Sequence, residues 1–194
     1  MLRYLWANYR PVFTKKSAAA AAFVLAFVWA RLRRLKKKGA VTRRQSAAAF
    51  ALSAYVVLML MSTVFSRSIK VYQPVNLSPL REFRRALRLR SWYSVKQIVL
   101  NVLMMMPVGM LTPAALGEGA THKGKKTLVF GLVLSIFIES MQAFLKVGTG
   151  DVDDVINNVI GTAAGAGAYQ LIVRFASGRP LGYHRHIDRR NRKR

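Results

Sequence analysis

The sequence predicts an all-α membrane protein, a polytopic transmembrane helical bundle of about five helices. Hydrophobic residues make up 53% of the 194 positions, and they gather in blocks instead of following the period of a soluble protein. Dense runs of Arg and Lys separate these blocks, as in membrane proteins with cationic loops. Residues 46–66 carry no charge over a membrane-spanning length.

The first block runs from Ser17 to about Leu32 and is short for a span, which needs about 20 residues. A signal peptide is the alternative, because Lys15 and Lys16 precede the apolar stretch. The run RLRRLKKK follows where a small-residue cleavage site would be expected, so we predict a retained helix. The second block, Ser46 to Ser66, is the clearest transmembrane helix.

Three further blocks follow. One extends from about Val95 to Leu116, where Pro107 removes a helical hydrogen bond and predicts a kink. The next, Thr127 to Leu145, is apolar except for two polar side chains, and the last spans Val152 to Phe175. That last block opens with acids and amides and continues as the small-residue stretch GTAAGAGAY. Its Gly161 and Gly165 form a GxxxG pair that predicts close helix packing.

The distribution of basic residues predicts the orientation. With five spans and the N-terminus outside, the cytoplasmic segments carry 19 Lys and Arg and the external segments carry 13. The positive-inside rule therefore favours a multi-pass membrane protein with its N-terminus outside and its C-terminus in the cytoplasm. The predicted organisation is a first helix with a basic loop, a membrane domain and a basic C-terminal tail: residues 1–45, 46–175 and 176–194.

The composition limits the partners and cofactors. The formal net charge is +25, but no stacking aromatics or groove-binding helix accompany it, so nucleic acid is not expected to bind. In PLREFRRALRLR, apolar residues alternate with arginines at helical spacing, as in a helix lying on an anionic membrane surface. A solvated basic loop is the alternative. Membrane lipids with anionic headgroups are the expected partners, and no oligomeric state is predicted.

No metal or cofactor is expected. The chain has no cysteine, which excludes disulfides and thiolate metal sites. The three histidines lack the spacing of metal ligands.

The candidate site rests on the placement of acids and amides. Four of only seven acids occupy the sixteen residues from Glu139 to Asp154. An unpaired carboxylate within an apolar helix is costly, so Glu139 should face inward with Gln142 one turn away. This pair could equally join two helices structurally. Capping of the last helix explains one of the three aspartates but hardly all of them.

The predicted topology brings sequence-distant polar residues to the same external depth. We therefore predict one ligand-binding site, formed by Asn76, Asn101, Glu139, Gln142, Asp153, Asp154, Asn157 and Asn158.

The same residues resemble a known family. NLSP, NVLMMMPVGMLTP, SIFIESMQ and GTGDVDDVINNVIG occur in that order, over roughly Ser46 to Tyr169, and are similar to the VanZ-like family. These are small bacterial membrane proteins named for a teicoplanin-resistance accessory protein. Members often carry an Arg in the turn before the acidic segment, where this chain has Lys146, Gly148 and Thr149. The resemblance implies a helical, multi-pass protein of the bacterial plasma membrane with a link to glycopeptide tolerance at the cell envelope.

Three functions compete. The first is a non-catalytic envelope protein that binds a polar lipid or a lipid-linked headgroup and contributes to teicoplanin tolerance. The second is an intramembrane enzyme that acts on such a lipid, with Glu139 or Asp154 as general base. The third is ion-coupled transport, which the absence of an internal repeat disfavours. The sequence shows no nucleophile motif, metal motif or phosphate-binding loop, so we favour the non-catalytic function.

Overall fold

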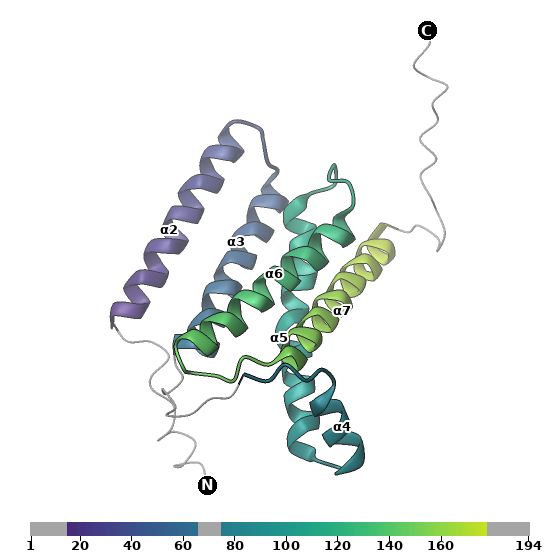
Figure 1. Cartoon of the computed structure of the whole chain (residues 1–194). Coiled ribbons are helices and arrows are strands. Elements are labelled where there is room, and N and C mark those ends of the chain that lie inside the picture. The colour runs from purple at the N-terminus through teal and green to yellow at the C-terminus, as the bar shows by residue number, and fades with distance from the viewer. Residues whose placement is uncertain (1–14, 66–74, 178–194) are drawn as a thin grey trace.

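The chain folds as an all-α bundle, which confirms the predicted fold class. The structure is a computed structural model that describes residues 15–65 and 75–177. The helices, labelled in Figure 1, are α2 (Lys15–Lys37), α3 (Arg43–Leu60), a π-helical turn η1 (Met61–Phe65), α4 (Arg81–Arg88), α5 (Trp92–Leu116), α6 (Lys123–Phe144) and α7 (Val152–Ser177). The predicted tail, residues 176–194, lies almost entirely outside the described residues, as do residues 66–74, which follow the second apolar block.

Four described helices are long and apolar enough to cross a membrane. They are Arg43–Phe65, Trp92–Leu116, Lys123–Phe144 and Val152–Ala176. The predicted count of five is not confirmed. The first block does form a helix, α2, but only the fourteen residues from Ser17 to Ala30 are free of charge. That length falls short of the roughly 20 residues that a span requires.

The ends of α3 and α5 are held together by one side chain. Thr42 caps α3. Its hydroxyl accepts from the backbone nitrogen of Gln45, and Oε1 of the Gln45 side chain accepts from the backbone nitrogen of Thr42. Gln45 Nε2 also donates to the carbonyl of Leu116, at 3.3 Å. The last turn of α5 therefore finds a hydrogen-bond donor that its own helix lacks. Gly117 ends α5 with a positive φ of 78°.

The closest helix contact joins α5 and α7, which lie side by side in Figure 1. A Cβ atom added at Gly161 would lie 2.2 Å from the Val102 carbonyl oxygen, and one at Gly165 would lie 2.0 Å from that of Met106. The two backbones thus touch where α7 has no side chain. Within a membrane, such contact replaces the hydrophobic driving force that water would supply.

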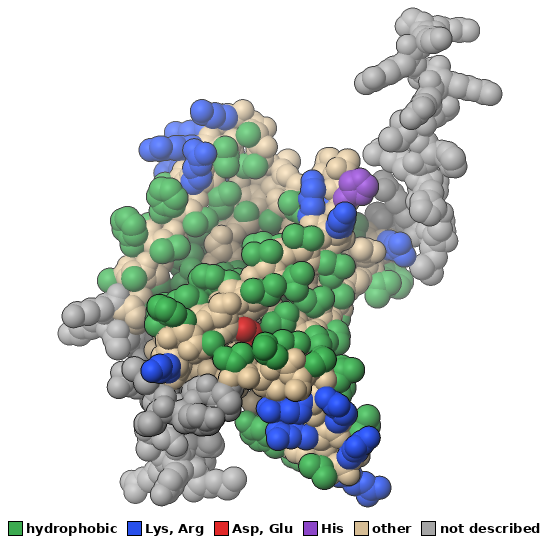
Figure 2. All heavy atoms as spheres, viewed as in Figure 1, with side chains coloured by type: hydrophobic (Ala, Val, Ile, Leu, Met, Phe, Trp, Pro, Cys, Tyr) green, Lys and Arg blue, Asp and Glu red, His purple; other side chains and the backbone are tan. Residues whose placement is uncertain are grey.

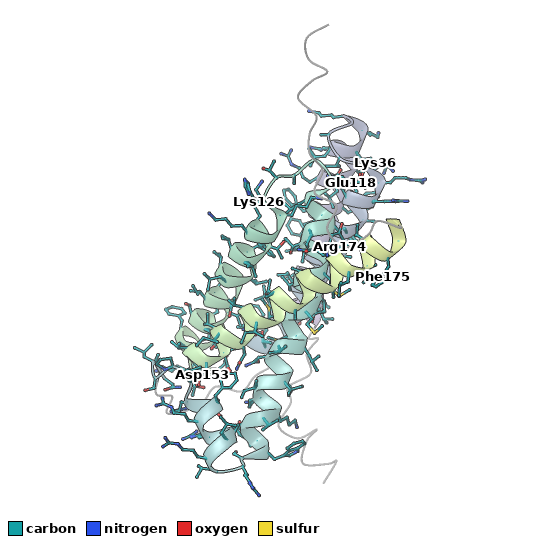
Figure 3. All side chains as sticks on the ribbon, turned by 90° about the vertical axis from the view of Figure 1, so that its right-hand side faces the viewer. Lys36, Glu118, Lys126, Asp153, Arg174 and Phe175 are labelled. Atoms are coloured by element: carbon teal, nitrogen blue, oxygen red, sulfur yellow. The ribbon has the colours of Figure 1, made fainter. Side chains whose placement is uncertain are left out.

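Charge is concentrated at the two ends of the bundle. Lys and Arg side chains cover the α2–α3 connection and the start of α6 at one end and α4 at the other, with an apolar band between them (Figure 2). Figure 3 places Lys36, Glu118, Lys126 and Arg174 at the first of these ends and Asp153 at the second, beside α4. We call the second the α4 end.

Candidate functional site

The segment before α4 and the turn before α7 join in a short parallel bridge. Asn76 pairs with Asp151: the Asn76 nitrogen donates to the carbonyl of Gly150 at 2.9 Å, and the Val152 nitrogen donates to the carbonyl of Asn76 at 3.1 Å. The Asn76 side chain also donates to Asp151 Oδ1, at 2.9 Å. The same carboxylate oxygen accepts from the Asp153 nitrogen at 2.9 Å, so Asp151 caps α7.

Asp153 fixes α4 to the bundle. The residue that precedes α4, Leu80, has a left-handed backbone (φ 61°) and no side chain able to cap a helix. Asp153, which lies on α7, caps α4 instead. Its two carboxylate oxygens accept from the backbone nitrogens of Leu80 and Glu82, the second at 2.7 Å. Its side chain is fully buried. A carboxylate at a helix N-terminus is favoured by the free N–H groups and by the helix dipole.

Glu139 and Gln142, one turn apart on α6, are both buried and contact different neighbours. Glu139 Oε2 accepts from the Asp151 nitrogen at 3.1 Å. Gln142 Nε2 donates to the carbonyl of Thr63, in the π-helical turn η1, at 3.3 Å. The polar side chains of α6 therefore connect α7 and the end of α3.

The amides of α5 and α7 complete the cluster. Asn101 Nδ2 donates to Asp154 Oδ1, and Asn158 Nδ2 donates to the hydroxyl of Ser135 on α6 at 2.8 Å. Asn157 is 1% exposed, and neither its amide nitrogen nor its oxygen has a hydrogen-bond partner among the described residues. An unsatisfied buried amide costs free energy, and Asn158 Oδ1 likewise has no partner among the described residues.

All eight predicted site residues lie at the α4 end, in one region formed by α5, α6, α7 and the 75–80 segment. Sequence reasoning missed several of their partners. The acidic stretch included Asp151, but no role was predicted for it. The helix PLREFRRALRLR was predicted to lie on a surface, although its Glu82 is buried. An acid among arginines was the one sequence feature that could have indicated a partner for Glu82, and none indicated Ser135 or Thr63.

The cluster is a hydrogen-bond network, and its residues line neither of two cavities found elsewhere among the described residues. One cavity lies between α2 and α3, and the other lies on the first turns of α6. Within the described part of the chain, no three His, Cys, Asp or Glu side chains could together hold a metal ion. The network fixes the positions of the first turns of α4 and α7 and of the end of α3.

The surface above the network is cationic and apolar. Arg84, Arg85 and Arg88 are exposed on α4. Exposed apolar side chains border them: Leu80, Leu87, Leu89, Trp92 and Tyr93. Glu82 accepts from Arg85 at 3.3 Å, and Arg81 lies 3.7 Å from Asp151 Oδ2. The predicted short helix is therefore present and exposes cations and apolar groups together, as interfacial helices do. Its orientation flat on a membrane stays a prediction.

Four long apolar helices joined by a buried polar network define an all-α membrane-embedded protein. The VanZ/LLP1 family model matches residues 47–173, most of the chain. The protein therefore belongs to the VanZ family, as the order of its motifs indicated. No curated protein and no solved structure matches the chain.

Proposed function

We propose that this VanZ-family protein is a non-catalytic component of the bacterial cell envelope. At its α4 end, on the outer side of the plasma membrane, it binds the anionic headgroup of a lipid or lipid-linked molecule. By occupying such headgroups it contributes to glycopeptide (teicoplanin) tolerance.

The observation that carries this proposal is the combination of an exposed arginine helix with a buried anchor. Arg85 and Arg88 are exposed beside Leu87 and Leu89, so cations and apolar groups can meet a headgroup and the adjoining acyl region together. Asp153 holds the first turn of the same helix against α7. A binding surface held in place loses less entropy on binding than a mobile basic loop.

The length of α5 supports an interfacial position for α4. Its 25 residues correspond to about 37 Å of helix, whereas the hydrocarbon core of a bilayer is about 30 Å thick. The first turns of α5, on which α4 packs, would extend into the headgroup region, where Trp92 and Tyr93 are favourable.

The carboxylates of α6 and α7, one buried and one partly buried, support a structural use. Glu139 and Asp154, the candidates for a general base, accept hydrogen bonds from the Asp151 nitrogen and the Asn101 amide within the bundle. A catalytic base needs reach to a substrate proton. The network supplies scaffolding for α4, and α4 supplies the binding groups.

The fluorescence of Trp92 tests the binding step. In the full chain with Trp6→Phe and Trp29→Phe, phosphatidylglycerol added to a neutral detergent should shift Trp92 emission, and phosphatidylcholine should not. Arg84→Gln/Arg85→Gln/Arg88→Gln should weaken the response by tenfold or more, since each cation contributes roughly 1 kcal/mol. The matched control, Lys123→Gln/Lys125→Gln/Lys126→Gln, removes equal charge at the opposite end and should respond normally. Equal responses in both triple variants contradict the proposal.

The cellular role and orientation have their own tests. In a deletion strain, the arginine variant should lose teicoplanin tolerance at normal abundance, and the lysine variant should retain it. Because the chain has no native cysteine, Leu89→Cys and Thr149→Cys can be labelled with an impermeant reagent in whole cells. Both should react from outside, and Glu118→Cys should not. Labelling of the two from opposite sides contradicts a shared external surface.

A further inference from the structure

We infer a second lipid site, at the opposite end of the bundle, in the groove between α2 and α3. Its ligand is an anionic phospholipid of the leaflet at that end, with the phosphate held by Arg33 and Lys36 and an acyl chain lying along Trp29 and Phe50. This site shares no residue with the headgroup surface of α4.

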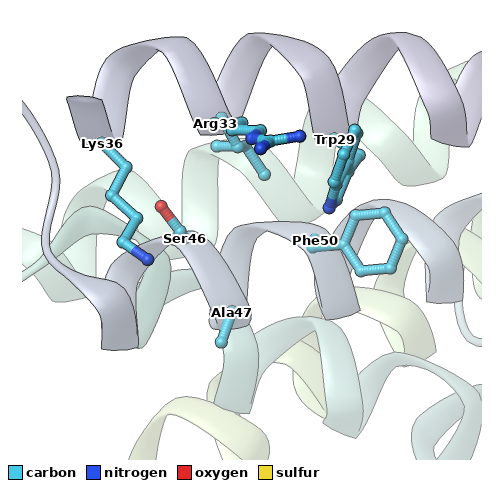
Figure 4. Close-up of a pocket in the computed structure, with 7 residues that line it drawn as sticks. Trp29, Arg33, Lys36, Ser46, Ala47 and Phe50 are labelled. Carbon is cyan, nitrogen blue, oxygen red and sulfur yellow. The ribbon is translucent and has the colours of Figure 1, made fainter. Parts of the chain in front are cut away.

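The groove is a defined cavity with two chemically different halves. Its volume is about 340 Å³, within the range of small-molecule sites, and it is lined by Trp29, Leu32, Arg33, Lys36, Ser46, Ala47 and Phe50. Figure 4 shows Lys36 and Ser46 toward the α2–α3 connection and the rings of Trp29 and Phe50 farther along the helices. The cationic half therefore lies toward the helix ends and the aromatic half toward the middle of the membrane, which is the order of groups in a phospholipid.

Among the described residues, the cations of the groove have no acidic partner. The first acid in the whole sequence is Glu82, so α2, α3 and their connection contain none. Glu118 lies at the same end of the bundle (Figure 3), but its carboxylate forms no ion pair within the described part of the chain. The guanidinium of Arg33 lies 5.1 Å from the centre of the Trp29 ring, a contact that leaves its N–H donors free for a phosphate.

Ser46 adds an independent indication. The residue lines the groove, and its hydroxyl, shielded from solvent, has no hydrogen-bond partner among the described residues. A buried hydroxyl without a partner costs free energy, which a phosphate oxygen in the groove would offset.

The packing of α2 indicates what this lipid would do. Helix α2 packs chiefly on α3, has no buried residue in its described side chains, and is absent from the four membrane-spanning candidates. A lipid that contacts both helices would add to the contact area between them. The lipid would thus secure α2 to the membrane domain.

Native mass spectrometry of the full chain in neutral detergent tests the site with phosphatidylglycerol as the probe. All chains compared carry Arg84→Gln/Arg85→Gln/Arg88→Gln, which removes the headgroup surface of α4. In this background, Arg33→Gln/Lys36→Gln should weaken binding about thirtyfold, the factor expected for two cations on one phosphate. The matched control is Arg34→Gln/Lys37→Gln. It removes the same charge from the same turns of α2 but changes no residue that lines the groove. Its affinity should change by about twofold at most. Equal losses in both variants, or no loss in the first, overturn the inference.

A second measurement leaves the cations unchanged. In the chain with Trp6→Phe and Trp92→Phe, phosphatidylglycerol with brominated acyl chains should quench Trp29, and brominated phosphatidylcholine should quench it much less. Equal quenching by the two lipids overturns the inference, because the groove would then select no charge. The variant Arg84→Gln/Arg85→Gln/Arg88→Gln should leave this quenching unchanged, so the proposal for each lipid site can be tested independently of the other.

Discussion

Helices α7 and α2 are of similar length, 26 and 23 residues, yet they join the bundle by opposite means. Helix α7 touches the backbone of α5 at its glycines, and its Asp153, Asp154 and Asn158 hold α4, α5 and α6. Helix α2 is rich in alanine, buries no described side chain and borders a cavity. The family match includes nearly all of α7 and excludes α2. Tertiary contacts therefore hold α7, whereas α2 depends mainly on its own helix propensity.

The largest effect should come from closing the α5–α7 contact. Gly161→Leu should destabilise the bundle by about 3 kcal/mol or more, because a side chain would meet the Val102 carbonyl at 2.2 Å and force the helices apart. Gly167→Leu is the control on the same helix, since nothing lies within 4 Å of a Cβ atom there. Thermal unfolding in detergent measures both. Equal stability of the two variants would remove α7 from the tight interface.

The next effect should come from the anchor of α4. Asp153→Asn replaces a carboxylate that accepts from two backbone nitrogens with an amide whose N–H₂ would face one of them. We expect a loss of about 2 kcal/mol and faster proteolysis within residues 75–90, because α4 loses its cap. Glu118→Gln removes a charge from an exposed position and should change stability by less than about 0.5 kcal/mol. Unaltered proteolysis in Asp153→Asn would mean that α4 is held by its contacts with α5 alone.

Glu139→Gln should have a smaller effect. The amide oxygen can still accept from the Asp151 nitrogen, so we expect a stability change below about 1 kcal/mol and retained teicoplanin tolerance. Glu139→Ala, which removes the acceptor, should cost about 2 kcal/mol. Loss of tolerance in Glu139→Gln at normal abundance would instead show that function requires the negative charge of Glu139. The functional site would then lie at the carboxylates of Glu139 and Asp154, and not on α4.

The smallest effect belongs to α2. Trp29→Ala in lipid-free detergent should lower stability by less than about 1 kcal/mol, because the ring is 52% exposed and contributes mainly a cation–π contact with Arg33. A loss as large as that of Gly161→Leu would place α2 within the cooperative core and would remove the contrast between the two helices.

The amino-acid sequence by itself determined the all-α class, four of the five predicted membrane-spanning blocks and the family. Uncharged runs such as residues 46–66 must be helical in lipid, where every backbone group needs a partner within its own segment. The rarity of acids also pointed to Glu139, Asp153 and Asp154, because a carboxylate near an apolar block is expensive unless it is paired.

Only the tertiary structure decided which hydrogen-bond partner each buried polar group has. Asp153 caps α4 from a helix 71 residues away in the chain, and Asp151 pairs with Asn76 across 75 residues. Local spacing cannot encode such partners, since they depend on how α4, α5 and α7 pack. The same limit applies to Glu82, which the helical pattern assigned to the surface and the fold buries at 8% exposure. Hydropathy is a property of one segment at a time, whereas the satisfaction of a buried polar group depends on which segments meet around it.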